Sequence, residues 1–373
     1  MGEITIKEVI TRKDLTEFIN LPSKIHKDEA DWLPPIYQDE WELFDRKRNK
    51  SFQYADAVLY LAFRGRRPVG RIMALVNNRY NSIHNEKHGR FCFMESYDDR
   101  EAFHALIDAA ERWVREKGMT RIVGPLAFSD KDPQGFQIEG FEYPQIMTTP
   151  TNSPYMPKML EWEGYTKEVD LVNYLVETPP ELPELYKRVY SRLMRTNEFR
   201  IVEFTARKEI KPYIIPVLEL MNETFSEIYG FVPLNDREKK DLAKRYLPIL
   251  DPEFIKIVEK NGEPVAFAIA MPEISAGLKA CGGKLFPFGI FRILKELKNS
   301  KKLMLMLGGI KKPYRGQGVD VLMAASVHKS ALKRNMTLID SHLILEKNNR
   351  MRAEIERFNG RVIKRFRIYQ KQI

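Results

Sequence analysis

The chain contains the same succession of patterns twice, and this repetition limits the folds that it can adopt. Residues 58–63 and 68–74 are rich in β-branched and aromatic side chains and flank a short charged turn, and residues 254–258 and 264–269 repeat the arrangement around Asn261-Gly262. Runs of this kind joined by a short turn predict β-hairpins, and Asn-Gly is a strong signal for a two-residue turn. Each half therefore predicts an antiparallel hairpin in an equivalent place.

Two further matches follow in the same order. In each half a helix with apolar residues at helical spacing leads into a short strand, and a glycine that ends a later helix precedes a strand with a tyrosine. The segments are 103–117, 119–123, Gly164 and Tyr174 in the first half, and 321–334, 336–339, Gly360 and Tyr369 in the second. Three matches in one order indicate a duplicated α/β unit. We predict an α/β (α+β) fold with two domains in tandem, each with a mixed central sheet flanked by helices.

Three prolines mark the expected joint between the two units. Pro179, Pro180 and Pro183 cannot donate to the interior of a sheet and suit an interdomain linker. We therefore expect a first domain over residues 1–178, a linker with a connecting helix over residues 179–199, and a second domain over residues 200–373.

Composition excludes several classes of protein. No apolar run approaches the roughly 20 residues that a membrane-spanning helix needs, and the charged, alternating start of the chain indicates a strand and not a signal peptide. Two cysteines exclude a disulfide framework, and His84 and His88 lack a third ligand, so we expect no metal. These features predict a soluble, cytoplasmic protein. The net charge of +10 admits nucleic acid, an anionic membrane face or a polyphosphate as partner and does not choose among them.

One segment carries a binding pattern. The apolar run 302–307 predicts a buried strand, and Gly308-Gly309 at its end permits a bulge that splays this strand from its neighbour and leaves backbone groups free for an extended ligand. Residues 315–318 (Arg-Gly-Gln-Gly) then open a helix. Consecutive backbone N–H groups and the positive end of a helix point outward from such a turn, which suits a pyrophosphate.

Residues 302–334 resemble the acyl-CoA-binding strand, pyrophosphate loop and helix of the GNAT acyltransferase superfamily. That loop runs Arg or Gln, two residues, Gly, one residue, and Gly or Ala. Arg315 and Gly318 match it, whereas Asp320 stands where a small residue is usual. The resemblance extends well over residues 200–373. Residues 1–176 share it through the repeat but lack the loop, and the whole is similar to a bacterial group with two GNAT-like halves.

The resemblance implies that acetyl-CoA or another acyl-CoA is the substrate and that an acyl group, most simply acetyl, passes to the amine of an unknown acceptor. It implies that backbone N–H groups near Gly309 and Ile310 hold the tetrahedral oxyanion. The residues that it assigns to acyl-CoA binding are Gly309, Ile310, Arg315, Gly316, Gln317, Gly318, Val319, Asp320 and Asn349.

The catalytic groups are less clearly marked. An amine with a pKa near ~10 must lose a proton before it attacks, which calls for a base or desolvation. The tyrosine that often protonates the leaving thiolate in this family is replaced by Glu356. The strand after the glycine-rich helix carries Asp340, His342 and Glu346 on one face, and we take His342 and Glu346 as the base candidates. Glu95 in the first half is an alternative carboxylate facing a shared cleft.

Two long segments are expected around the site. Loops as long as residues 127–156 are usually functional or disordered, so we expect this one to line the acceptor site. The stretch 286–297, with Arg292, Lys295 and Lys298, is compatible with a membrane-surface helix or with an insertion packed over the cleft. We favour the packed insertion and expect no membrane partner.

Two other functions remain open. Fem-type transferases, which use aminoacyl-tRNA, also resemble paired GNAT folds, and a degenerate pair could bind CoA, nucleic acid or a protein without turnover. Nucleic acid is therefore possible as a partner but not favoured, and no pattern indicates an oligomeric state.

Salt dependence separates these possibilities. Binding of tRNA through phosphate contacts should weaken steeply between about 50 and 200 mM salt, whereas binding of CoA through backbone N–H groups should change modestly. Titration of each ligand at both salt concentrations measures the difference, and a steep loss of CoA binding would contradict the backbone loop.

Overall fold

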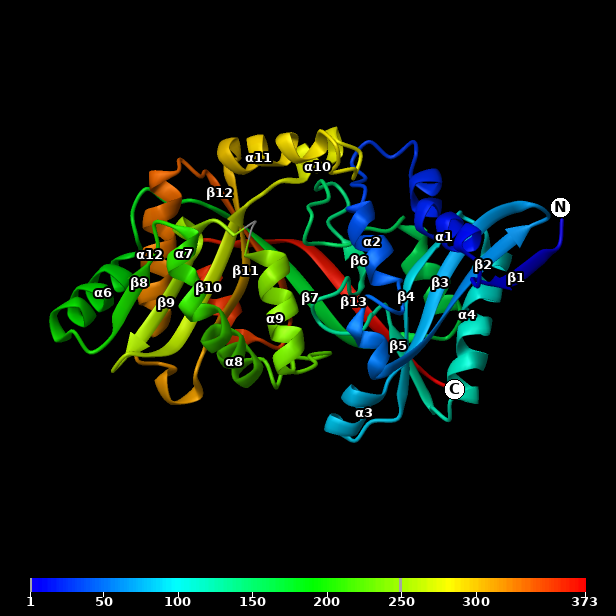
Figure 1. Cartoon of the computed structure of the whole chain (residues 1–373), viewed down its shortest axis with the longest axis horizontal. Helices are drawn as coiled ribbons and strands as arrows, with labels where there is room; N and C mark the ends of the chain where they lie inside the picture. Colours follow the sequence, from blue (N-terminus) through cyan, green and yellow to red (C-terminus); the bar gives the residue numbers. More distant parts are fainter. Residues whose placement is uncertain (1, 248–249) are drawn as a thin grey trace.

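The computed structural model describes residues 2–247 and 250–373, and these residues form one continuous 13-stranded mixed sheet. The strand order is β1-β2-β3-β4-β5-β13-β7-β12-β11-β10-β9-β8, and β6 pairs with β13 beside this path. Helices cover both faces of the sheet, and the two halves lie end to end along the long axis (Figure 1).

The first half contributes β1 (Ile4–Glu8), β2 (Ala55–Arg64), β3 (Arg67–Asn77), β4 (His88–Ser96), β5 (Arg121–Gly124), β6 (Phe136–Glu139) and β7 (Thr166–Glu177). The second half contributes β8 (Arg200–Glu203), β9 (Ile255–Lys260), β10 (Glu263–Pro272), β11 (Lys302–Ile310), β12 (Leu338–Leu345) and β13 (Arg361–Gln372). The helices are α1 (Arg12–Ile25), α2 (Tyr37–Leu43), α3 (Asn78–His84), α4 (Arg100–Glu116), α5 (Tyr155–Trp162), α6 (Glu184–Thr196), α7 (Arg207–Ile210), α8 (Ile214–Thr224), α9 (Asp236–Tyr246), α10 (Ser275–Ala280), α11 (Gly289–Asn299), α12 (Val319–Lys333) and α13 (Asn349–Glu356).

Counted inward from the two ends of the sheet, the strands correspond one to one: β1 to β8, β2 to β9, β3 to β10, β4 to β11, β5 to β12 and β13 to β7. This symmetry confirms the duplication. β2–β3 and β9–β10 are the two predicted hairpins, and Asn261 and Gly262 both have positive φ, as the predicted turn requires. In each half the strand after the hairpin runs parallel to the next one, as β4 with β5 and β11 with β12. The predicted α/β fold class is confirmed, with the two expected sheets joined into one.

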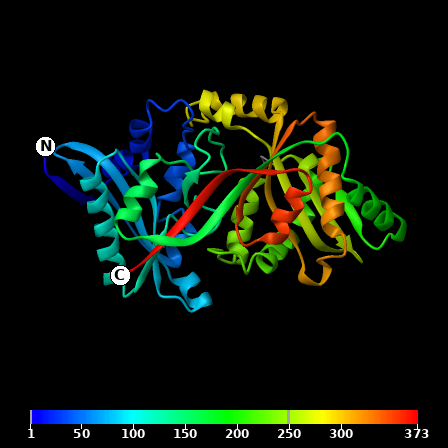
Figure 2. The same cartoon turned by 180° about the vertical axis from the view of Figure 1, so that it is seen from behind.

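The join depends on an exchange of last strands between the halves. β13, the end of the chain, pairs with β5 of the first half, while β7 of the first half pairs with β12 of the second. β7 and β13 pair with each other along most of their length, as the crossing of the red and green strands shows from behind (Figure 2). Each half therefore obtains a central strand from the other.

Apolar layers on both faces of the sheet fix each half. In the first half Phe103 of α4 is buried on one face and Phe18 of α1 on the other, each in its own cluster. In the second half α12 covers one face through Leu322, and α8 covers the other through Met221.

The insertion with α10 and α11 spans the two halves. Ile274 and Leu278 pack with Leu33 and Ile146 of the first half in one buried cluster, and the amide of Tyr37 donates to Gly283 O. This cluster closes the space between the halves on the side of α10 and α11. No helix in the described part of the chain is both long enough and apolar enough to cross a bilayer.

The strand exchange predicts that neither half folds alone. A fragment of residues 1–178 lacks β13, so β5 and β7 lose their shared partner and β7 also loses β12. We expect this fragment to lack a cooperative thermal transition, because unpaired strand edges and uncovered apolar surface remain. Circular dichroism on heating measures this.

A chain cleaved only between residues 179 and 183 is the matched control. Its strand pairing is unchanged, so both fragments should stay associated in gel filtration. A fragment 1–178 that folds as a stable monomer would contradict the account.

Candidate functional site

β11 and β12 separate shortly after they begin to run together. Their parallel pairing covers only Lys302–Met304 against 338–340, while β11 stays paired with β10 as far as Ile310. The bulge in β11 lies at Met306, because Leu305 and Leu307 pair with consecutive residues of β10. The expectation of a bulge at Gly308-Gly309 is therefore wrong. Gly309 has another role, since a Cβ there would lie 2.4 Å from Thr224 Oγ1 of α8.

The separation leaves one edge of β11 open. Beyond Met304 the described residues provide no strand that pairs with the side of β11 facing β12. Leu305, Met306 and Leu307 are half-buried, so an occupant of this edge would be partly shielded from water. An open edge of this kind can bind an extended ligand through main-chain hydrogen bonds.

The glycine-rich turn lies at the end of the open edge. Gly316 and Gly318 have φ of 76° and 87°, a region that favours glycine, and Gly318 is the residue before α12. Arg315 Nε donates to Ile310 O at 3.0 Å, and Gln317 Nε2 donates to Pro313 O at 2.7 Å. These bonds hold the turn at the start of α12, where the first backbone N–H groups of the helix have no partner within it.

The surroundings of this turn are mixed in charge. Asp320 is directed to α13, where it hydrogen-bonds Glu354. Burial and this neighbouring carboxylate raise the pKa of Glu354, which also accepts from the Tyr186 hydroxyl. On α6, the exposed Arg188 and Arg192 adjoin the two residues that contact Gly318. The carboxylate is thus held by α13, and two cations stand beside the turn.

His342 lies where β12 bends away. Its φ is 57°, and the register of β12 against β7 shifts between Asp340 and Leu343. Burial lowers the pKa of His342 to about 4, and its Nδ1 accepts the amide of Leu343. The ring is therefore neutral at pH 7, and its proton is on Nε2. His342 can donate a hydrogen bond from Nε2, but it is poorly placed to act as the predicted base.

Glu346 directly follows the end of β12, six residues beyond Asp340. Its carboxylate lies 2.7 Å from Lys167 Nζ and accepts the amide of Asp170 at 3.3 Å. Both partners are on β7, so Glu346 ties β12 to the exchanged strand.

Asp340, which the sequence places on one face with His342 and Glu346 but which was not chosen as a base, lies at the last position of β12 that pairs with β11. Asp340 accepts from Asn173 Nδ2 at 2.6 Å, and burial raises the pKa of its carboxyl. Lys364 of β13 faces the same region, donates to Pro144 O at 2.8 Å, and has a pKa lowered by burial to about 8. Elements from both halves therefore meet where β11 and β12 part.

A residue to which the sequence analysis gave no role in the site lies beside Glu356. The Tyr174 hydroxyl of β7 donates to Glu356 at 2.6 Å and accepts from Arg352 Nε at 2.9 Å. A tyrosine from the exchanged strand thus reaches α13 near the position where the family carries its own. Asn349, the first residue of α13, is exposed.

Glu95 belongs to a separate cluster in the first half. It pairs with Arg71 at 2.7 Å and with His26 at 2.9 Å, and Glu29 lies 2.9 Å from the other ring nitrogen of His26. Burial alone would raise the pKa of Glu95, but Arg71 and His26 hold it below its usual value. Burial raises the pKa of Glu40, which faces this cluster, to about 7.

Glu95 and His342 do not form one site. Four strand spacings, about 19 Å in total at the usual separation, lie between β4 and β12 in the sheet. The structure brings His342 and Asp340 together and leaves Glu95 apart.

In the first half, the loop after β5 enters the gap between β4 and β5, which is the equivalent of the open gap between β11 and β12. The amide of Leu126 donates to Phe91 O of β4 at 2.9 Å, and buried Arg90 donates to Ala127 O and Phe128 O. At the start of α4 the Asp99 carboxylate accepts from the amide of Ala102. The loop after β5 thus pairs with β4 at Phe91, where the gap would begin, and the Asp99 carboxylate lies at the start of α4, where an anion could otherwise bind.

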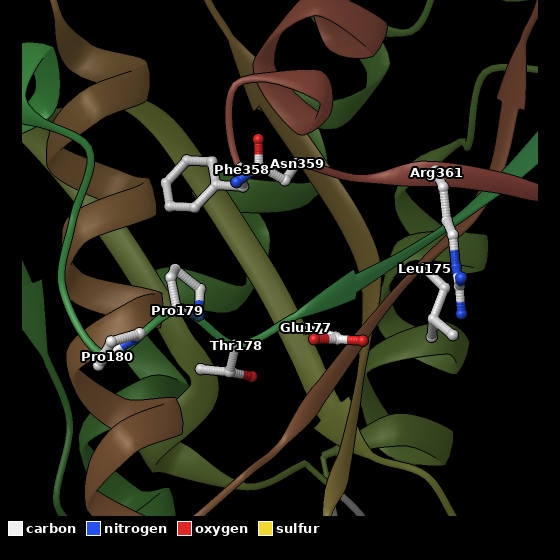
Figure 3. Close-up of a pocket in the computed structure, with 8 residues that line it drawn as sticks. All are labelled: Leu175, Glu177, Thr178, Pro179, Pro180, Phe358, Asn359 and Arg361. Atoms are coloured by element: carbon white, nitrogen blue, oxygen red, sulfur yellow. The ribbon is translucent and has the colours of Figure 1, made fainter.

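A cavity of about 430 Å³ lies elsewhere, between the linker and the turn from α13 to β13. Figure 3 shows Phe358 and Pro179 on its wall, with Glu177 and Arg361 beyond them. Glu177 pairs with Leu338, the first residue of β12, so the cavity lies at the opposite end of β12 from the glycine-rich turn. None of its lining residues is a predicted site residue.

Comparisons with known proteins agree with this architecture. No family model matches the chain. It is 26% identical over 379 residues to a protein named bacterial ceramide synthase from Caulobacter vibrioides (100% of this chain, 98% of the relative). It is also 26% identical over 375 residues to protein YghO of Escherichia coli (99% and 95%).

Among solved structures, a tandem GNAT protein from the clavulanic acid biosynthesis pathway is similar, with a TM-score of 0.56 and 11% identity over 99% of this chain and 98% of that one. A GCN5-related N-acetyltransferase from Sphaerobacter thermophilus gives a TM-score of 0.55 and 13% identity over 99% and 95%. The fold of the chain is therefore that of tandem GNAT proteins, as the sequence predicted.

The buried cluster around Glu95 predicts an unusual pH dependence. The folded state holds a proton on Glu40 up to about pH 7, whereas the unfolded chain releases it near pH 4.5. Stability contributed by this group therefore falls as pH rises between those values. We expect Glu40→Gln to raise the free energy of unfolding by about 1 to 2 kcal/mol at pH 8. At pH 4 the same substitution should change this free energy little, because Glu40 is already protonated.

Denaturant unfolding at both pH values measures this, with the exposed Glu3→Gln as control. Equal effects of Glu40→Gln at pH 4 and pH 8 would show that Glu40 is an ordinary surface carboxylate.

Proposed function

We propose that this chain, which has the tandem GNAT fold, is an N-acyltransferase whose second half binds acyl-CoA between β11 and β12. The observation that carries the proposal is the open edge of β11 leading to a glycine-rich turn at the start of α12. In the first half the loop after β5 enters the equivalent gap and the glycine-rich turn is lacking, so one acyl-CoA site per chain is expected.

In this proposal the pantetheine lies along the open edge of β11 and the pyrophosphate lies on the turn. Backbone N–H groups of residues 316–320 would bind the phosphates, and N–H groups of β11 near Gly309 and Ile310 would bind the pantetheine amides. The thioester carbonyl would lie farther back along β11, beside the bulge at Met306 and toward Asp340 and His342. Asp320 places a negative charge near the phosphates, and its interaction with Glu354 of α13 reduces this repulsion without removing it.

We assign the proton transfer to Asp340 and the support of the oxyanion to His342. The amine nitrogen attacks the thioester carbonyl and gives a proton to Asp340, whose raised pKa suits a general base. The neutral imidazole of His342 donates from Nε2 to the oxyanion without losing its proton. Asp340 then returns the proton to the departing thiolate, so the products are an amide and free CoA.

The acceptor in this proposal is an amine with a long apolar chain. Met304 and Ile146 are buried in one cluster, and the half-buried Met306 of β11 and Met147 of the first-half loop extend this cluster as an apolar wall beside the open edge of β11. The relative from Caulobacter is named as a ceramide synthase, and a ceramide is the amide of a long-chain amino alcohol. The wall and the name both favour a fatty acyl-CoA and a lipid amine over acetyl transfer to a polar acceptor.

Binding of acyl-CoA predicts a shift in thermal stability. A ligand at 100 times its dissociation constant adds about 2.7 kcal/mol to the free energy of unfolding, and we expect this from a long-chain acyl-CoA. Gln317→Glu, which adds a charge without changing size on an exposed side chain of the turn, should remove the shift.

Asp320→Asn is the control with the opposite change of charge. It should increase the thermal stabilisation by acyl-CoA, because it removes a negative charge near the phosphates. A wild-type protein with no shift for any CoA ester, or a shift that Gln317→Glu leaves intact, would place the ligand elsewhere.

The assigned roles predict distinct kinetic effects. Asp340→Asn should lower kcat by roughly 10²-fold or more, and His342→Ala should lower it by about 10²-fold. Because the pKa of His342 is about 4, its titration should leave no inflection in kcat/KM between pH 5.5 and 8. Glu346→Gln is the control, and we expect it to retain activity since Glu346 pairs with Lys167.

The pH profile and the three variants can be measured by thiol release from acyl-CoA in the presence of a long-chain amine. An inactive Glu346→Gln beside an active Asp340→Asn would reverse the assignment.

A further inference from the structure

We propose that the outer face of α11 and the loop before it dock this protein onto a bilayer with anionic headgroups. The inference does not need the acyl transfer proposed above, because docking requires neither acyl-CoA nor an amine. It goes against the expectation from the sequence that no membrane partner exists.

The first observation is a group of exposed aromatic side chains. Phe286, Phe288 and Phe291 are 71%, 74% and 65% exposed, and Leu294 is 50% exposed. Most other exposed large apolar side chains among the described residues, such as Ile10, stand singly, and the two on α6, Leu185 and Met194, are nine positions apart and lie on opposite faces of the helix. A cluster of apolar residues on the surface indicates an interaction site, whereas single ones are normal.

The second observation is that the opposite face of α11 is fixed. Ile293 is 6% exposed and packs with Leu278 of α10 and with Met304 of β11. A Cβ on Gly277 would lie 2.9 Å from Arg292 O, so α10 and α11 pack backbone against backbone. The outer face therefore cannot turn inward to bury its phenylalanines without breaking this packing.

The third observation is the charge among these aromatic residues. Lys284, Arg292, Lys295 and Lys298 are exposed on and just before α11, and none of them has an ion-pair partner among the described residues. Lys295 and Lys298 lie on the helix between the positions of Leu294, Phe291 and Phe288. The stems of such side chains can cover apolar surface while their charges reach the headgroups. Aromatic residues mixed with cations are typical of helices that lie in a membrane interface.

The same charges argue against a second copy of the chain as the partner. In a two-fold dimer this face would meet itself, so the four cations of one chain would oppose the four of the other. An anionic bilayer instead offers many negative headgroups above an apolar layer, which complements both components of the surface.

The position of the insertion gives the docking a consequence. α10 and α11 lie along the outer edge of the molecule, above β11, in both views (Figures 1 and 2). The inner face of the insertion contacts Met304 and Met306, next to the open edge of β11. Docking would therefore place the apolar wall beside this edge close to the membrane surface.

Sedimentation with vesicles tests the proposal on the full chain. We expect the protein to pellet with vesicles of phosphatidylcholine and phosphatidylglycerol in equal amounts, and much less with phosphatidylcholine alone. Replacement of Phe286, Phe288 and Phe291 by Ser should reduce the bound fraction per lipid by at least about tenfold. Lys295→Gln with Lys298→Gln should weaken binding to the anionic vesicles only.

A triple variant of Ile10, Ile83 and Trp162 to Ser is the matched control, because these residues are equally exposed but lie in the first half. It should bind vesicles like the wild type. Since all the replaced side chains are exposed, circular dichroism should show each variant folded.

A direct readout comes from Phe288→Trp, whose added fluorescence should be quenched by brominated lipid, whereas that of Ile83→Trp should not. Failure of the wild type to pellet, or equal binding by the Phe-to-Ser variant, would overturn the proposal. Dimerisation without vesicle binding in analytical ultracentrifugation, abolished by the same variant, would assign the surface to a second copy instead.

Discussion

The pairing of β7 with β13 is the interaction on which the rest of the structure depends. These are the two longest strands in the described chain, and each is also paired with a strand of the other half. Without this exchange the duplicated units would be two separate sheets with exposed edges. With it, residues of both halves, such as Asp340, Asn173 and Lys364, lie together at the centre of one sheet. The candidate site is therefore a product of the joint and not of one unit.

The same topology has two different outcomes in the two halves. Parallel strands that separate must leave backbone groups without partners, and these groups need hydrogen bonds from somewhere. In the first half the amide of Leu126 supplies one of them, to Phe91 O, the Arg90 guanidinium holds the carbonyls of residues 127 and 128, and Asp99 caps the following helix. In the second half the edge of β11 and the start of α12 stay available. Duplication followed by closure of one gap explains why a chain with two such folds would hold a single acyl-CoA.

Local patterns made the fold and the loop predictable, and long-range contacts made the site harder to predict. The hairpins, the helix after Gly318 and the insertion over residues 274–300 are encoded by neighbouring residues, and the structure has them in place. The hydrogen bond of Asp340 with Asn173 joins two residues that are 167 positions apart in the sequence, and that of Glu356 with Tyr174 joins two that are 182 positions apart. The exchanged strands create both contacts, and no local pattern marks the exchange. The sequence indicated His342 as a site residue by its position on the strand. Its proposed role as a hydrogen-bond donor follows from its burial and from the bond between its Nδ1 and the Leu343 amide, neither of which the sequence shows.

Hydrogen–deuterium exchange with and without a long-chain acyl-CoA tests the central claim most directly. The account predicts that the ligand slows exchange in peptides covering residues 305–310 and 316–320, since these amides would bind the pantetheine and the pyrophosphate. Peptides covering residues 91–96 of β4 should not change, because the loop after β5 already pairs with β4 at Phe91 and the first half lacks the glycine-rich turn. Protection in β4 instead of β11, or no protection in either, would contradict the assignment of acyl-CoA to the second half.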